Sequence, residues 1–196
     1  MKKLPIKKIA VLAALSFTFC TAAISQTVFQ AKAFDIKLNG TSNIHDWEMK
    51  ANSGSSEAVF NINDNGKITS ITKLNFVLPA TNLKSKHSGM DKNTYKALKT
   101  DKNPNISFVG TSAHITSTSG DTYQITCKGN LTIAGTTKLT DLVATAKYNP
   151  ADKSLTVTGV KRMKMTEYNV QPPTALLGTI KTGDDISIAY NLKFIK

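Results

Sequence analysis

The stretch ISIAYNLKF, residues 186–194, decides the fold class of this 196-residue chain. Its apolar side chains stand at every second position, and small or polar residues stand between them. Successive side chains of a β-strand point to opposite faces of the sheet. The pattern therefore predicts a strand with one buried and one solvent-exposed face, as in an antiparallel sheet that is covered on one side.

The same alternation recurs along most of the chain and predicts about eight strands. The apolar positions are Phe34, Ile36 and Leu38; Phe60 and Ile62; Leu74, Phe76 and Leu78; Ile106 and Phe108; Tyr123, Ile125, Cys127, Leu131 and Ile133; Leu142, Ala144, Ala146 and Tyr148; and Leu155, Val157, Gly159, Met163 and Met165. Turn residues separate these runs at hairpin spacing, for example at residues 64–66 and 149–152. Such strands hide their apolar faces in two packed sheets or a closed barrel, and the hairpin order favours an up-and-down antiparallel barrel.

A short helix is expected within the long connection formed by residues 80–104. Asp91 is a candidate N-cap for a helix over residues 92–99. Met90 and Tyr95 have the spacing of a hydrophobic staple, which packs a residue before the cap against the first turns of the helix.

The first 25 residues have the pattern of a secretory signal peptide: four lysines, an apolar run at residues 9–19, and then small residues. The run is too short to cross a bilayer, which takes about 20 residues. The small residues allow cleavage after Ala23 or after Ser25. Ser25 is favoured, and it leaves residues 26–196, the length of one domain, in the periplasm or outside a bacterial cell. Cys20 offers a lipid-anchored form as an alternative, but the bulky Phe19 before it disfavours that processing.

The charge and the cysteine content exclude several classes of protein. Loss of the four leader lysines lowers the net charge from +12 to +8. Arg162 is the only arginine, and proteins that read nucleic acid rely on arginine, so nucleic acid is not an expected partner. The lysine excess favours solubility and transient contact with anionic membrane surfaces. Cys127 has no partner for an internal disulfide, and its place beside Ile125 predicts a buried, unreactive thiol.

The segment containing His45 and Asp46 raises the question of an active site. Adjacent residues of a strand point apart, so Asp46 cannot orient His45 there. Trp47 and Met49 would then point inward, and His45 would pack at the rim or make a polar contact with a ligand. The three histidines lack metal-binding spacing. We therefore expect no catalytic residues, no metal and no cofactor.

Five motifs follow one another in a specific order. They are GTSNIHDW at residues 40–47, Met90-Asp91 with YKAL at 95–98, NPNISF at 103–108, GNLTIAGTT at 129–137, and residues 178–184 before the last strand. In this order they resemble the YceI family of bacterial periplasmic proteins, over nearly all of the mature chain. The resemblance implies an extended, lipocalin-like, eight-stranded antiparallel barrel. It also implies an apolar pore for a polyisoprenoid, such as an isoprenoid quinone or a polyprenyl phosphate, and no shared catalytic residues.

A barrel of eight strands is either filled by side chains or holds one slim ligand. The small residues Ala144, Ala146 and Gly159 leave room for a chain, or they merely fit against larger neighbours; both alternatives stay open. The residues expected to line an apolar tube are Phe34, Trp47, Phe76, Phe108, Leu142, Ala144, Tyr148, Met163 and Tyr190, with His45 as a polar contact.

Two functions are compatible with these observations. The first is a periplasmic carrier or buffer of an isoprenoid-type lipid. The second is an envelope stress-response or interaction protein whose barrel is a scaffold without a specific lipid. An enzyme acting on the lipid lacks an acid–base pair. The sequence leaves open the identity of the lipid, its delivery partner and the oligomeric state, including a dimer.

Overall fold

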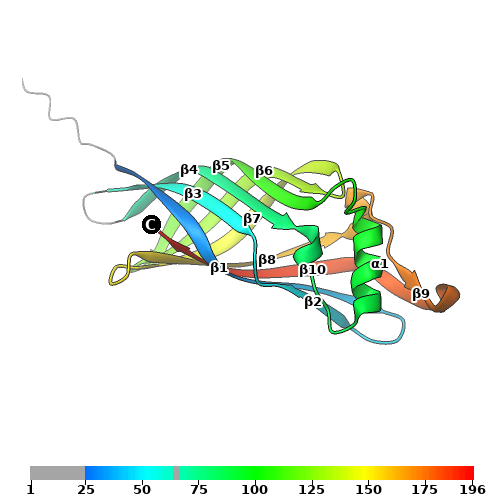
Figure 1. The fold of residues 1–196 in the computed structure, drawn as a ribbon. Coiled ribbons are helices and arrows are strands. Elements are labelled where there is room, and N and C mark those ends of the chain that lie inside the picture. The colour runs from blue at the N-terminus through cyan, green and yellow to red at the C-terminus, as the bar shows by residue number, and fades with distance from the viewer. Residues whose placement is uncertain (1–24, 64–66) are drawn as a thin grey trace, which may run out of the picture.

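The computed structural model describes residues 25–63 and 67–196. The predicted signal peptide up to residue 24 and the predicted turn at 64–66 lie outside the described residues. The strands are β1 (Ser25–Ser42), β2 (Trp47–Ala51), β3 (Ser55–Ile62), β4 (Ile68–Pro79), β5 (Asn105–Ser119), β6 (Thr122–Ile133), β7 (Thr136–Asn149), β8 (Ser154–Lys164), β9 (Thr174–Ala175) and β10 (Ile180–Ile195). The helix α1 (Ser88–Leu98) and the short 3-10 turns η1 (Ala80–Asn82), η2 (Met165–Tyr168) and η3 (Leu176–Gly178) connect them (Figure 1).

Eight of these strands close into an antiparallel barrel. Strands β3 to β8 pair in chain order, β8 pairs with β10, and β10 pairs with β1 to complete the wall. The long strand β1 pairs with β3 along its first half and with β2 along its second half. Strand β9 pairs only with the start of β10. The predicted fold, an eight-stranded antiparallel barrel with one short helix, is confirmed.

Large buried side chains fill the end of the barrel that holds the β5–β6 and β7–β8 turns. The rings of Phe29 and Phe60 meet edge to face with their centroids 5.3 Å apart, a favourable arrangement of aromatic rings. The hydroxyl of Tyr123 accepts a hydrogen bond of 3.3 Å from the backbone N–H of Ile68. Leu155 is also fully buried at this end. We call Phe29, Phe60, Tyr123 and Leu155 the floor of the barrel.

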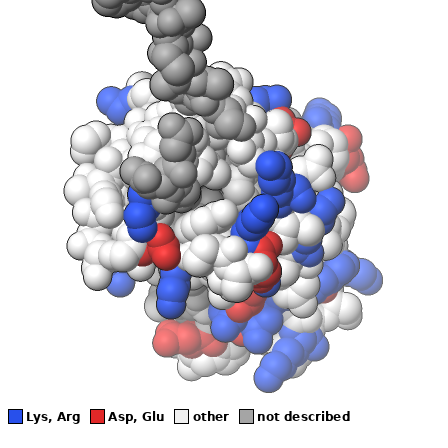
Figure 2. Space-filling model, turned by 90° about the vertical axis from the view of Figure 1, so that its left-hand side faces the viewer, with Lys and Arg blue, Asp and Glu red and all other residues white. Residues whose placement is uncertain are grey.

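Ion pairs join the hairpins outside the floor. Lys67 Nζ lies 2.7 Å from Asp121 Oδ1, and Lys193 Nζ lies 3.1 Å from Asp152 Oδ2. Both pairs are exposed to solvent, so each stabilises the fold by only about 0–1 kcal/mol. Basic and acidic side chains are mixed on this end of the molecule (Figure 2).

Helix α1 lies at the opposite end of the barrel (Figure 1). Its predicted start at Asp91 is wrong, because the helix begins at Ser88 with His87 as its N-cap. The carboxylate of Asp91 accepts hydrogen bonds from the backbone N–H and the hydroxyl of Ser85, each at 2.7 Å. Asp91 therefore binds the preceding connection and does not cap its own helix.

Tyr95 holds α1 against that connection. Its hydroxyl shares a hydrogen bond between the backbone oxygens of Thr81, at 2.9 Å, and Leu83, at 2.8 Å. The predicted staple does not apply, because Met90 lies inside the helix rather than before it. Among the described residues, no helix is long and apolar enough to cross a membrane.

Candidate ligand-binding cavity

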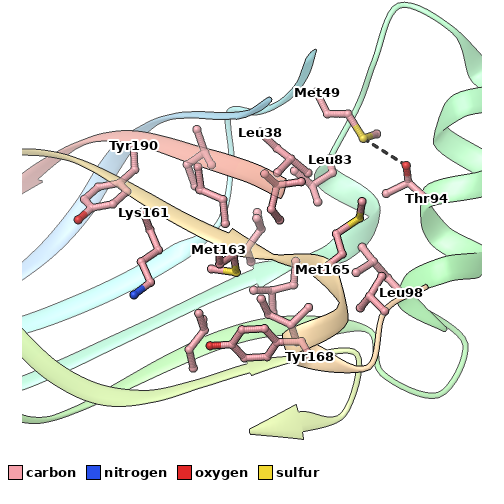
Figure 3. Close-up of a pocket in the computed structure, with 18 of the residues that line it drawn as sticks. Leu38, Met49, Leu83, Thr94, Leu98, Lys161, Met163, Met165, Tyr168 and Tyr190 are labelled. Carbon is pink, nitrogen blue, oxygen red and sulfur yellow. Dashed lines mark hydrogen bonds between the residues drawn. The ribbon is translucent and has the colours of Figure 1, made fainter. Parts of the chain in front are cut away.

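An apolar cavity of about 540 Å³ occupies the barrel between the floor and α1 (Figure 3). Ligand sites for small molecules commonly measure about 300–1,000 Å³. Inward-facing side chains of the strands form its wall, and α1 covers it from one side. Figure 3 shows Leu38, Met49, Leu83, Leu98, Met163 and Met165 in the lining. These residues come from distant parts of the chain, so the cavity exists only in the closed barrel.

The structure brings most of the predicted tube residues together. Trp47, Phe76, Phe108, Leu142, Ala144, Met163 and Tyr190 all line the cavity, and His45 lies at its rim. Phe34 and Tyr148 are not in the lining. The Phe34 ring lies against Gly54, in the break between β2 and β3, where an added Cβ would be 3.4 Å from it. Tyr148 pairs with Leu155, at the level of the floor.

Two aromatic lining residues lie flat over a glycine of the neighbouring strand. Trp47 pairs with Gly40, and Tyr190 pairs with Gly159. A Cβ on either glycine would overlap the aromatic side chain. The polar atom of each ring reaches the wall: Trp47 Nε1 donates to the backbone oxygen of Thr41 at 2.9 Å, and Tyr190 Oη donates to that of Val143 at 3.0 Å. Both rings therefore present an apolar face to the cavity with their polar atoms satisfied.

One cationic side chain interrupts this apolar wall. Within the described residues, Lys161 of β8 is the only Asp, Glu, Lys or Arg in the lining. Its Nζ donates to Thr140 Oγ1 at 2.7 Å and to the backbone oxygen of Asp141 at 3.2 Å. No ion pair of the described residues includes it. An ammonium group has three donors, so one N–H of Lys161 is left for another acceptor.

Lys161 lies where the pairing between β7 and β8 ends. The two strands pair from Asn149–Ser154 to Ala144–Gly159, and no pair follows toward α1. Beyond that point the side chains of Tyr190 and Lys161 hydrogen-bond the backbone of β7 from inside the barrel. The sequence analysis missed Lys161. Its position between Gly159 and Met163 in the alternating pattern would have placed it on the inward face.

Burial raises the pKa values of three weakly acidic groups in the described lining, Cys127, Tyr168 and Tyr190, and all three are protonated at neutral pH. Burial raises the pKa of the Cys127 thiol to about 11, helped by the negative charge of Asp141. Burial likewise raises the pKa of Tyr190 to about 12. Cys127 is a free, buried cysteine, as predicted. A protonated thiol is a poor nucleophile, so these groups give the cavity no reactive centre.

The cavity reaches the surface at the α1 end. Within residues 25–63 and 67–196, the exposed residues of its lining all lie there: Ile44, His45, His87, Gly89 and Thr174. β2 begins at Trp47, so His45 belongs to a loop and not to a strand as assumed from the sequence. His45 Nδ1 donates to the backbone oxygen of Asp46 at 2.7 Å, which orients the ring without a carboxylate. No group of three or more His, Cys, Asp or Glu that could hold a metal ion occurs in the described part.

Comparisons with known proteins agree with this geometry. Burkholderia cenocepacia BcnA has a similar crystal structure, with 20% sequence identity and a TM-score of 0.59 over 81% of this chain and 95% of that one. A polyisoprenoid binding domain from Saccharophagus degradans, implicated in plant cell wall breakdown, gives 9% identity and a TM-score of 0.62 over 85% and 97%. The Campylobacter jejuni YCEI protein gives 14% and 0.51 over 100% and 99%.

Because the sequence identities to these three structures are low, the structural similarities show only that the fold is shared. Among curated proteins, no significant match to this sequence was found. The model of the YceI-like domain, however, matches residues 20–194, which is most of the sequence. The chain therefore belongs to the YceI-like domain family.

Proposed function

We propose that this protein is a periplasmic carrier or buffer that binds an isoprenoid-type lipid inside its barrel. The observation that carries the proposal is the apolar cavity of about 540 Å³, closed by the floor and open at the α1 end. Burial of apolar surface stabilises a bound chain by about 25 cal/mol per Å². Binding therefore requires no catalytic group. The similar domain from Saccharophagus degradans is described as polyisoprenoid-binding, which supports the same class of ligand here.

Lys161 supports a ligand with a polar head that accepts hydrogen bonds. A charged ammonium group in an apolar wall is costly unless it is hydrogen-bonded or paired. Lys161 has two partners on β7 and one N–H to spare. The oxygen of a quinone or of a phosphate would satisfy that donor, and a phosphate would also supply the opposite charge. The apolar tail of the same molecule would fill the rest of the cavity.

The cellular setting is part of the proposal. The leader pattern of residues 1–25 supports export, with removal of the leader. A carrier in the periplasm must take its lipid from a membrane, so transient contact with a membrane surface is included. No cofactor and no catalytic step are included, because the cavity holds no paired acid and base.

Mass spectrometry of an organic extract from the purified protein tests the proposal. We expect an isoprenoid-type lipid at close to one molecule per protein. A folded protein that carries no lipid, and takes up none when offered isoprenoid quinone or polyprenyl phosphate, would contradict it. That result would favour the second function, a scaffold in the cell envelope.

The variant Lys161→Met tests the role of the head group. Hydrogen bonds to charged groups contribute about 1.5–3 kcal/mol. We therefore expect a loss of affinity of about 10- to 150-fold for geranylgeranyl phosphate and little change for a hydrocarbon of the same length. Lys147→Met, at an exposed position of β7, is the matched control. Equal losses for both ligands would show that Lys161 only supports the wall.

A further inference from the structure

Three exposed apolar side chains gather beside the opening of the cavity. Leu176 is 71% exposed, Leu177 is 110% exposed and Ile44 is 56% exposed. We call them the apolar tip. The leucines lie at the turn between β9 and β10, which projects at the α1 end of the molecule (Figure 1). Leu177 is fully exposed and Leu176 buries less than a third of its surface within the described structure, so burial in the fold does not explain these two leucines.

The backbone of this turn does not suit leucine either. Leu176 has φ 49° and Leu177 has φ 55°, and Gly178 follows with φ 88°. The backbone N–H of Thr179 donates to the oxygen of Leu176 at 3.1 Å, which closes the turn. The central residues of this turn are Leu177 and Gly178, where tight turns with two positive φ values strongly favour Asn-Gly. Leu176, just before them, also has a left-handed backbone that non-glycine residues rarely adopt. Two leucines at such positions oppose the local preference of the chain.

Asn43 fixes the two parts of the apolar tip to each other. Its Nδ2 donates to the backbone oxygen of Thr179 at 2.9 Å, and its Oδ1 accepts from the backbone N–H of Lys181 at 2.8 Å. A backbone bond of 3.1 Å from Asn43 to Lys181 completes the link. Ile44, the next residue, both belongs to the apolar tip and lines the cavity. The tip is therefore a defined surface at the rim of the opening.

Unpaired lysines surround this end of the barrel. Lys92, Lys96 and Lys99 lie on the exposed face of α1 and its cap, and Lys181 lies in the hairpin below the turn. None of the ion pairs in the described residues includes any of them. The carboxylate of Asp91 in the same helix is held by Ser85.

We infer that the apolar tip docks this protein onto an anionic lipid bilayer, with the cavity opening facing the membrane. Apolar side chains that enter the headgroup region beside lysines that face anionic lipids are the combination that holds proteins on a membrane surface. The inference rests on the proposed function for its purpose, since a lipid would pass between the bilayer and the cavity through the opening. The lysines around the opening favour an anionic bilayer over a neutral one as the surface that the apolar tip contacts.

The double variant Leu176→Asn/Leu177→Gly tests this inference. It removes both apolar side chains and places residues that tolerate a positive φ at both positions, so it should fold at least as well as the wild type. Flotation with vesicles of phosphatidylcholine, with and without phosphatidylglycerol, measures docking. The control is Val109→Ser/Leu139→Ser, which removes two exposed apolar side chains, 49% and 61% exposed, from the barrel side.

We expect the wild type and the control to float with the phosphatidylglycerol vesicles, less so at high salt. The tip variant should bind them about tenfold more weakly or worse. Wild-type flotation by the tip variant, or no flotation by the wild type, would overturn the inference. The lipid content of the purified protein is measured separately. A protein that carries lipid but does not float refutes docking alone, and one that floats through its tip but carries no lipid refutes the carrier alone.

Discussion

The substitution Ala144→Trp is the most direct test of the cavity. Ala144 is 8% exposed and lines the cavity from β7, between Ile125 of β6 and Gly159 of β8. A tryptophan at this position points into the space that a bound chain would use. An indole brings about 150–250 Å² of surface. A lipid that loses this contact area, at about 25 cal/mol per Å², binds more weakly by up to about 4–6 kcal/mol. This free energy corresponds to a loss of affinity of roughly 10³- to 10⁴-fold.

The assay is the lipid load of purified protein, by mass spectrometry, for the wild type and the variant. Chemical denaturation shows whether the variant is folded, and the existing void should keep the overpacking cost at the low end of about 1–3 kcal/mol. Val143→Trp is the matched control, because Val143 is the preceding residue and points outward, 48% exposed. It should keep its lipid. A folded Ala144→Trp protein with the full wild-type load would refute the assignment of the cavity as the binding site.

Three further predictions concern single side chains. His45→Ala should leave most lipid binding intact, because the binding energy comes from apolar burial; loss of the lipid by the folded variant would make His45 a principal contact. Tyr95→Phe removes a shared hydrogen bond to Thr81 and Leu83 and should lower the free energy of unfolding by about 1–2 kcal/mol, whereas Tyr148→Phe should change it little. Cys127 stays protonated below its raised pKa of about 11, so its alkylation in the native protein should keep accelerating up to that pH. A native rate at pH 8 equal to that of the unfolded chain would contradict this.

The face of each strand could be predicted from the sequence, but the depth of each residue in the barrel could not. Alternation put Phe34 and Tyr148 on apolar faces, and both are partly buried against the core. Whether such a residue reaches the cavity depends on the strand register, which no local pattern contains. Phe34 follows an irregularity in the β1–β10 pairing between Ala31 and Ala33. Tyr148 lies beside the β7–β8 turn.

Tertiary contacts also decided the start of α1 and the role of Lys161. Asp91 is a good cap by local rules, but Ser85 from the connection uses its carboxylate. Lys161 was overlooked because a charged residue breaks an apolar pattern, although its spacing fits the inward face. Lys161 faces inward at the point where the β7–β8 pairing ends, and the position of that end depends on both strands. The apolar tip, in contrast, is a feature that only the folded chain makes visible.

The floor of the barrel has a consequence for traffic through the molecule. Every exposed lining residue that the structure describes lies at the α1 end, and the other end is filled by Phe29, Phe60, Tyr123 and Leu155. Whatever chain enters must leave through the opening it came in by, with the segment that entered first leaving last. Such a tube cannot join two membranes as a conduit. In the proposed carrier role, it would work as a shuttle that turns the same face to its donor and then to its acceptor.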